Sequence, residues 1–115
     1  PFAKKAIELN PNLWEGHHNL IKILRSLNRP IDAAKYAETA RDLFSNNHLF
    51  NGLLGDIYSD IGNFEKAKYN YKKAISKSPN DDETIYSYAN FLIGTGKKKE
   101  GIDYLNKAIK VNSVN

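Results

Sequence analysis

The sequence predicts an all-α chain, a solenoid of helix–turn–helix units that repeat every 34 residues. Several columns of residues recur at that spacing, and the clearest are columns of small residues. Within each unit, apolar residues recur at steps of three and four, the period of an amphipathic helix. No segment sustains the alternation of apolar and polar residues that indicates a strand, so we expect no sheet. The small columns are Ala6, Ala40, Ala74 and Ala108, and then Ala33, Ala67 and Gly101.

The middle unit shows both helices and their ends. Its first helix ends at Gly62-Asn63, because glycine is favoured just past a helix end. Its second helix ends at Ser78-Pro79-Asn80, because the residue before a proline avoids helical angles. The next helix opens in Asn80-Asp81-Asp82-Glu83, where Asp or Asn suits the N-cap. The pattern is carried by Leu53, Leu54, Ile57, Tyr58 and Ile61, and then by Ala67, Tyr71, Ala74 and Ile75.

Composition fits a globular chain and excludes several kinds of site. The 115 residues are 41% hydrophobic and 26% charged, values that argue against disorder. The lack of cysteine excludes disulfides, thiolate zinc sites and thiol catalysis. No apolar run approaches the roughly 18 residues of a membrane-spanning helix, and no signal peptide is visible. Because the sequence has no methionine, we expect it to be a piece of a longer protein.

A 34-residue unit with these columns resembles the tetratricopeptide repeat, whose pattern is W-x₂-L-G-x₂-Y, then A-x₃-F, then P. The unit 48–81 matches best, although Asn51 stands where the pattern has Trp and Tyr71 where it has Phe. The units 14–47 and 82–115 match more weakly, and residues 1–13 look like the second helix of a preceding unit. A 35-residue RNA-reading helical repeat is the nearest rival, but the spacing favours the tetratricopeptide family. The matching residues of unit 48–81 are Leu54, Gly55, Tyr58, Ala67, Ala74 and Pro79.

The resemblance implies a right-handed superhelical solenoid and a protein–protein interaction role. In this family the first helix of each unit lines a concave groove, which binds an extended peptide or a helix of a partner protein. Three- and four-residue steps place one face of each first helix in that groove. The groove residues expected on this basis are Glu15, His18, Lys22, Arg25, Leu49, Gly52, Asp56, Ser59, Glu83, Tyr86, Asn90 and Ile93.

The expected groove surface is chemically mixed. His18, Lys22 and Arg25 form a basic stripe that could hold a carboxylate. Asp56 and nearby Asp60 could hold a basic group instead, and any exposed helix face carries such residues without a ligand. Further groove contacts are apolar, from Tyr86 and Ile93, or hydrogen bonds to a peptide backbone, from Asn90. One subclass of the family grips the carboxylate tail of chaperones with Lys and Asn four residues apart, and that pair is missing here.

The second helix of the middle unit is strongly basic. Its five lysines, offset by Glu65, give a charge of +4, which equals the net charge of the chain. A patch for nucleic acid or anionic lipid is one interpretation. A solvated outer helix is the interpretation that we favour, so we expect no nucleic-acid partner. The lysines are Lys66, Lys68, Lys72, Lys73 and Lys77.

The sequence gives no motif for catalysis, a metal or a cofactor. His17 and His18 are adjacent and point to different sides of a helix, so they are poor chelators. No glycine-rich phosphate loop or nucleophile motif is present. We therefore predict a non-catalytic scaffold with a protein or peptide partner. The alternatives are the non-catalytic arm of a larger enzyme, such as a glycosyl-, sulfo- or methyltransferase, and a module that associates with itself through uncapped ends.

Overall fold

The computed structural model describes residues 13–114, so the helix expected within residues 1–13 lies almost wholly outside the described residues. The described part consists of helices joined by short turns and contains no strand, which confirms the prediction of an all-α repeat solenoid. The helices are α2 (Trp14–Ser26), α3 (Pro30–Leu43), α4 (His48–Ile61), α5 (Phe64–Lys77), α6 (Asp82–Gly94) and α7 (Lys98–Val114).

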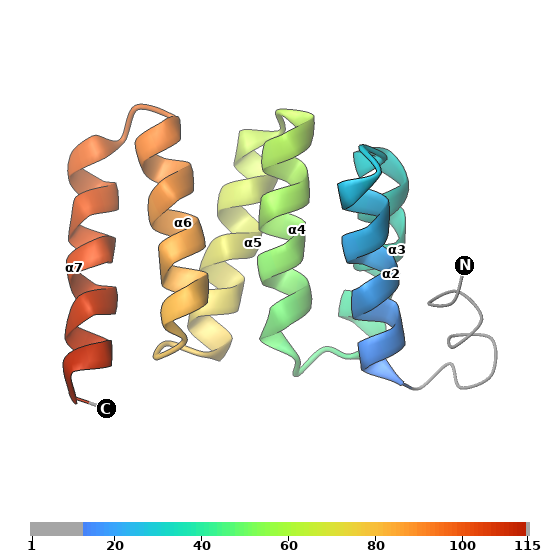
Figure 1. Cartoon of the computed structure of the whole chain (residues 1–115), viewed down its shortest axis with the longest axis horizontal. Coiled ribbons are helices and arrows are strands. Elements are labelled where there is room, and N and C mark those ends of the chain that lie inside the picture. The colour runs from blue at the N-terminus through green and yellow to red at the C-terminus, as the bar shows by residue number, and fades with distance from the viewer. Residues whose placement is uncertain (1–12, 115) are drawn as a thin grey trace.

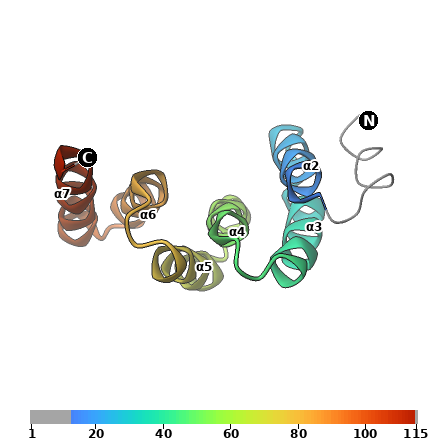
Figure 2. The same ribbon diagram turned by 90° about the horizontal axis from the view of Figure 1, so that it is seen from below.

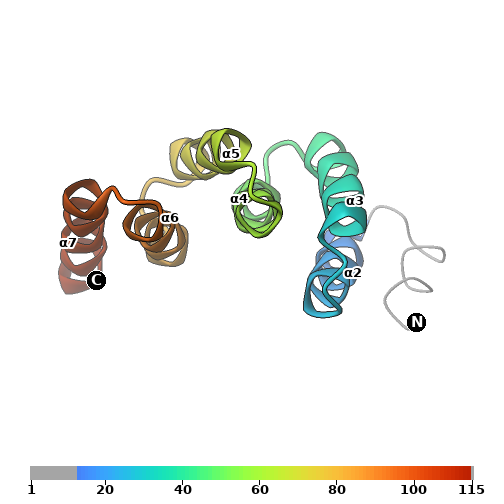
Figure 3. The ribbon, with the colours of Figure 1, turned by 90° about the horizontal axis from the view of Figure 1, so that it is seen from above.

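The helices stand side by side along an arc. Figure 1 shows them running roughly parallel or antiparallel to one another, with the first and last described helices at opposite ends. Seen along the helices, α2, α4 and α6 lie on the inner side of the arc, and α3 and α5 lie on its outer side (Figures 2 and 3). Each pair α2–α3, α4–α5 and α6–α7 packs tightly, and α3 also packs against α4. The inner helices therefore share one concave face.

The turn inside each helix pair has the same geometry three times. Asn28, Gly62 and Gly96 occupy one column and all have positive φ, at 58°, 93° and 91°. A left-handed residue at this point ends a helix and lets the next backbone N–H bond to a carbonyl one turn back. That closing bond also recurs every 34 residues, from Arg29 to Leu24 at 2.9 Å, from Asn63 to Tyr58 at 2.9 Å and from Lys97 to Leu92 at 2.8 Å. The predicted helix end at Gly62-Asn63 is thus confirmed.

Side chains cap the start of the middle helices. The carboxylate of Asp81 accepts a hydrogen bond from the backbone N–H of Glu83 at 3.2 Å, so Asp81 is the N-cap that the acidic run predicts. Asn47 and Asn63 cap α4 and α5 in the same way. Such a cap satisfies one of the backbone N–H groups that a helix start leaves unpaired, and it stabilises the helix by about 1 kcal/mol.

The columns of small residues lie where helices approach one another closely. Ala33, Ala67 and Ala74 are fully buried. A Cβ on Gly55 would lie only 2.6 Å from Cδ1 of Tyr71, so the Tyr71 ring rests directly on the α4 backbone. On its other side this ring contacts α6, with ring centroids 5.6 Å from Tyr88 and 5.3 Å from Phe91. One aromatic side chain thus joins two units.

A pair of glycine substitutions tests this packing. We expect Gly55→Ala to lower the free energy of unfolding by roughly 1–3 kcal/mol, the usual cost of overpacking a core. Gly52→Ala, three residues earlier on the same helix, meets nothing within 4 Å. It should instead stabilise the chain by about 1 kcal/mol, because alanine is the better helix former. Urea unfolding followed by circular dichroism measures both values, and equal changes in the two variants would contradict the role of Gly55.

Candidate functional site

The concave face holds a cavity of about 720 Å³ between α2, α4 and α6. These are the helices on the inner side of the arc in Figure 2, and each belongs to a different helix pair. A second, adjoining cavity of about 360 Å³ lies between α4 and α6. Arg25, Asp56 and Asp60 line both cavities, so we treat the two as one groove.

Most of the residues expected in the groove line these cavities. The larger cavity is lined by the expected residues His18, Lys22, Arg25, Leu49, Gly52, Asp56 and Glu83, and the smaller one adds Ser59 and Asn90. Glu15, Tyr86 and Ile93 line neither cavity, so their place in a binding site stays a prediction. Ile93 packs toward α7 instead, since a Cβ on Gly101 would lie 2.5 Å from its Cγ1.

The groove also contains residues that lie outside the helix faces expected from the sequence. Ser87 lines both cavities in place of its neighbour Tyr86, which shows that α6 is rotated relative to the expected face. The 34-residue column gives a signal for this, because Ser87 aligns with Leu53, another lining residue. The remaining unexpected lining residues are Ser26, Asn28, Asp81 and Thr84 in the larger cavity, and Tyr71 and Phe91 in the smaller one.

Arg25 does not stand free in the groove, because it binds an acid of the same chain. Its Nε donates to Oδ2 of Asp60 at 2.7 Å and its Nη2 donates to Oδ1 at 3.3 Å, a two-pronged contact between α2 and α4. Its Nη1 lies 3.9 Å from Oδ2 of Asp56. The hydrogen bond to Asp60 is the main reason why the pKa of Arg25 is raised. The expected basic stripe is therefore already neutralised at this position.

The rest of the stripe is also weak as a cationic site. Burial, together with the charge of Lys22, lowers the pKa of His18, so the imidazole is neutral at pH 7. The ring packs edge-on against Trp14 and Phe50, with centroids 5.9 and 6.0 Å away. Lys22 is the remaining residue of the stripe, and it forms no ion pair within the described part of the chain.

Asp56 lies at the junction between the groove and the core. Its Oδ1 accepts a hydrogen bond from the hydroxyl of Tyr71. Burial raises the pKa of Asp56, against the opposing effects of this hydrogen bond and of Arg25. Burial and the Asp56 carboxylate in turn raise the pKa of Tyr71, so its hydroxyl stays protonated and remains a donor. The carboxylate is thus held in a fixed orientation by a core side chain.

A second carboxylate, Asp81, joins two helix starts at the rim of the groove. Its Oδ2 lies 2.6 Å from Nε2 of His48 on α4 and accepts from Oγ1 of Thr84 at 2.9 Å. Burial on its own would raise the pKa of Asp81, but the hydrogen bonds from His48, Thr84 and the Glu83 backbone hold it below the ordinary value. Asp81 therefore ties α4 to α6 in its ionised form.

The family follows from comparison with known proteins. A sequence profile described as Tetratricopeptide repeat matches residues 50–81 and 82–115. The chain belongs to the tetratricopeptide repeat family. TPR repeat-containing protein YpiA of Bacillus subtilis (strain 168) is 23% identical over 114 residues, which are 99% of this chain and 27% of YpiA.

Solved tetratricopeptide structures share the fold at low sequence identity. MamA (41-end) from Desulfovibrio magneticus RS-1 superposes with a TM-score of 0.85 and is 16% identical, over 98% of this chain and 64% of that one. YrrB, described as a TPR protein with an unusual peptide-binding site, gives a TM-score of 0.81 at 23% identity, over 98% of this chain and 58% of that one. The chain thus spans about a quarter of YpiA and less than two thirds of each solved chain.

The departure from the tetratricopeptide pattern at Asn51 has a structural explanation. Asn51 is buried, and its Nδ2 donates to Oδ1 of Asn70 at 3.3 Å while its Oδ1 accepts from Nζ of Lys77 at 2.6 Å. Asn70 in turn donates to the backbone carbonyl of Lys66 at 2.9 Å. A polar network between α4 and α5 takes the position of the Trp, and its buried amides have the partners that they require.

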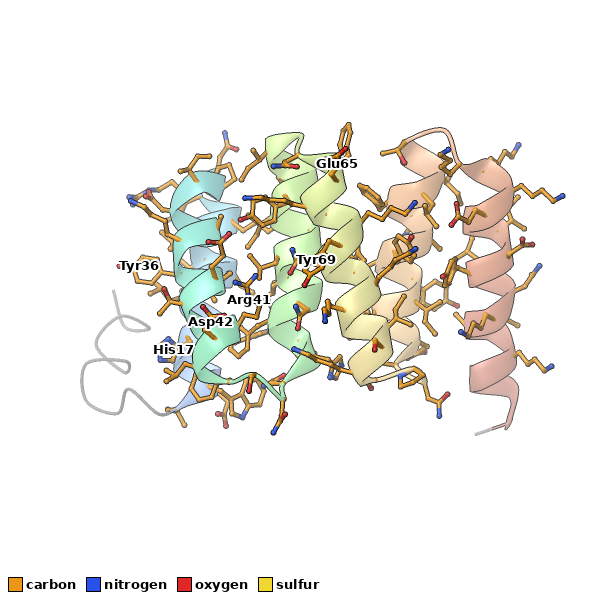
Figure 4. The ribbon with its side chains drawn as sticks, turned by 180° about the vertical axis from the view of Figure 1, so that it is seen from behind. His17, Tyr36, Arg41, Asp42, Glu65 and Tyr69 are labelled. Atoms are coloured by element: carbon orange, nitrogen blue, oxygen red, sulfur yellow. The ribbon has the colours of Figure 1, made fainter. Side chains whose placement is uncertain are left out.

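The five lysines of the basic helix of the middle unit lie on α5, on the outer side of the arc (Figure 3). Figure 4 shows that side, with Tyr36 on α3 and Tyr69 on α5. Two of the lysines lie over aromatic rings, Lys66 at 5.2 Å from the Tyr58 centroid and Lys73 at 5.8 Å from that of Tyr69. The solvated outer helix stays our interpretation of this face.

Further candidates for chemistry are sparse in the part of the chain that the structure describes. It contains no cluster of three His, Asp or Glu side chains arranged to hold a metal ion. His17 is buried and packs edge-on against Phe44, with ring centroids 5.4 Å apart. Among the described helices, none is both long enough and apolar enough to cross a bilayer.

The tie between Asp81 and His48 predicts a pH dependence of stability. A carboxyl whose folded pKa lies below its ordinary value of 3.8 stabilises the fold above that pH, and this stabilisation is lost as the pH falls through the folded pKa. We expect Asp81→Asn, which can still cap α6, to be less stable by roughly 1–2 kcal/mol at pH 7. The difference from wild type should shrink below about pH 4.

Thermal unfolding between pH 2 and pH 7 measures this difference. Asp103→Asn is the matched control, because Asp103 is an exposed carboxylate on α7 for which the described structure shows no ion pair. It should follow wild type at every pH. A constant gap between Asp81→Asn and wild type over the whole range would show that the Asp81 charge plays no part.

Proposed function

We propose that this chain is a non-catalytic interaction module that binds an extended segment of a partner protein in the concave groove. The observation that carries the proposal is the groove itself, which three consecutive inner helices line together. Its larger cavity has a volume of about 720 Å³. This lies within the range of about 300–1,000 Å³ that is usual for ligand sites.

The lining suits a peptide backbone as well as side chains. Ser26, Asn28, Thr84 and Ser87 bring hydroxyl and amide groups to the larger cavity. Such groups both donate and accept hydrogen bonds, as the amides of an extended chain require. Leu49 and Leu53 add apolar surface from α4. The peptide-binding site of YrrB, a tetratricopeptide protein with the same fold, gives independent support.

The cluster of Thr84, Asp81 and His48 contains the residue types of a catalytic triad, but its arrangement supports a non-catalytic role. Thr84, Asp81 and His48 form a chain of contacts, but the carboxylate stands between the hydroxyl and the imidazole. In a hydrolytic triad the imidazole stands in the middle, so that it can take the proton of the nucleophile. This cluster is an N-cap whose carboxylate also contacts His48.

Filling the groove tests the proposal. No atom lies within 4 Å of a Cβ added to Gly52, so Gly52→Trp should place a large side chain in the cavity without disturbing the fold. Gly94→Trp is the matched control, because Gly94 is equally open and lines neither cavity. Short random peptides displayed on phage are selected on wild type, and selected peptides are measured by fluorescence anisotropy. We expect Gly52→Trp to weaken binding at least tenfold and Gly94→Trp to leave it unchanged.

Two results would contradict the proposal. One is the absence of any peptide that wild type enriches over a surface without protein. The other is a set of peptides that bind Gly52→Trp and Gly94→Trp equally, because those peptides would then bind outside the groove. Circular dichroism of both variants confirms that each still folds.

Self-association is a second candidate function, and the surface of α7 favours it. Ile102 is 41% exposed on this helix, although isoleucine is usually buried. A second copy that covers it would bury apolar area and stabilise a dimer. Sedimentation velocity over a wide range of concentrations should then show a concentration-dependent sedimentation coefficient that Ile102→Lys abolishes. A monomer at every concentration would exclude this candidate.

A further inference from the structure

We propose that the groove contains a subsite for a cationic side chain of the ligand, a lysine or an arginine, formed by Asp56 and Asp60 where α4 meets α6. This inference rests on the proposed function, because it names the chemistry of the segment that the groove binds. The subsite is the smaller cavity of about 360 Å³.

The walls of this cavity suit a long side chain with a charged end. Asp56 and Asp60 are four residues apart, so both carboxylates lie on one face of α4. Ser87 and Asn90 from α6 add polar groups to the lining. Tyr71 and Phe91 also line the cavity, but they are 2% and 8% exposed, so its wall is mainly polar. The wall therefore presents acids and amides to the charged end of a lysine or arginine side chain.

The carboxylates still have hydrogen-bonding capacity. An ionised carboxylate offers about four acceptor positions. Asp56 uses Oδ1 for the hydroxyl of Tyr71, and its Oδ2 is 3.9 Å from the nearest Arg25 nitrogen, too far for a hydrogen bond. Asp60 is 38% exposed at its side chain and accepts two bonds from Arg25. A ligand ammonium or guanidinium therefore finds an open acceptor on Asp56 and a reachable one on Asp60.

Charge in the groove has the opposite sign to that of the whole chain. The lining residues of the two cavities include two permanent cations, Lys22 and Arg25, and four carboxylates. The lining therefore sums to −2 when His18 is neutral, in a chain of net charge +4. The carboxylates are Asp56, Asp60, Asp81 and Glu83. An excess of acid in a partly enclosed site attracts a basic segment and repels an acidic one.

Arg25 shows how such a cation is held. Its guanidinium forks onto Asp60, which is the strongest geometry for pairing these groups. The Arg25 side chain is 40% exposed, so it can leave this contact without breaking the core. Arg25 thus occupies an acceptor that a basic ligand would use, and it competes with that ligand. An acidic ligand, by contrast, would need Arg25 as its partner.

Substitutions of Arg25 and Asp60 should therefore change the affinity for a basic peptide in opposite directions. Arg25→Gln removes the internal competitor, so it should strengthen the binding of a basic peptide about threefold or more. Asp60→Asn removes the negative charge and should weaken binding about tenfold, the usual effect of losing one charge-assisted hydrogen bond. Asp103→Asn, on the exposed surface of α7, should leave binding unchanged. Thermal unfolding of each variant shows whether the fold is retained.

The probe is again a phage-displayed library of short random peptides selected on wild type. We expect the enriched sequences to share a lysine or arginine at one position, and selection on the double variant Asp56→Asn, Asp60→Asn to lose that preference. A synthetic peptide with this residue replaced by glutamine should bind wild type about tenfold more weakly. The replacement should make no difference in the double variant, because the partner is then absent.

Each outcome separates this inference from the proposed function. Enriched peptides without a shared basic residue that still fail to bind Gly52→Trp would overturn the cationic subsite and leave groove binding intact. Acidic peptides that lose affinity for Arg25→Gln would overturn it as well, in favour of the basic stripe. A failure of wild type to enrich any peptide would overturn both.

Discussion

The contact between the Tyr71 ring and Gly55 is the constraint on which the centre of this molecule depends. The ring lies against the α4 backbone because glycine has no Cβ there, and the same ring stacks with Tyr88 and Phe91 of α6. The Tyr71 side chain thus contacts both of two consecutive units. The Tyr71 hydroxyl then reaches Asp56 in the groove, so the packing of the core also orients a carboxylate at the site.

The rigidity and the charge of the groove depend on how the units contact one another. Repeats of this kind contact mainly their neighbours, so a surface that spans three units is only as rigid as the contacts between them. Here those contacts are partly polar and lie at the groove itself, through Arg25 with Asp60 and His48 with Asp81. The same side chains therefore hold adjacent inner helices together and set the charge of the groove. A ligand that exchanges these bonds for its own would also change how the units are held.

The 34-residue columns are enough to predict the helices, their ends and the tight helix contacts. Asn28, Gly62 and Gly96 are spaced 34 residues apart, and all three have positive φ at the same turn. The N-cap predicted in the acidic run is found at Asp81. These features are local or recur at a fixed spacing, so a single sequence carries them several times. About half of the groove-lining residues could be predicted for the same reason, although the ligand could not.

Tertiary structure alone decided which charges pair across the groove and how each helix is rotated. Arg25 and Asp60 are 35 residues apart and belong to different units, so no local pattern shows that they neutralise each other. Helix α6 packs on α5 and α7, and in this position it brings Ser87 to the cavity in place of Tyr86. The sequence by itself determined the repeat, because backbone geometry and burial act on every unit alike. The chemistry of the groove depends on single side chains from different units, and only their positions in space determine which of them meet.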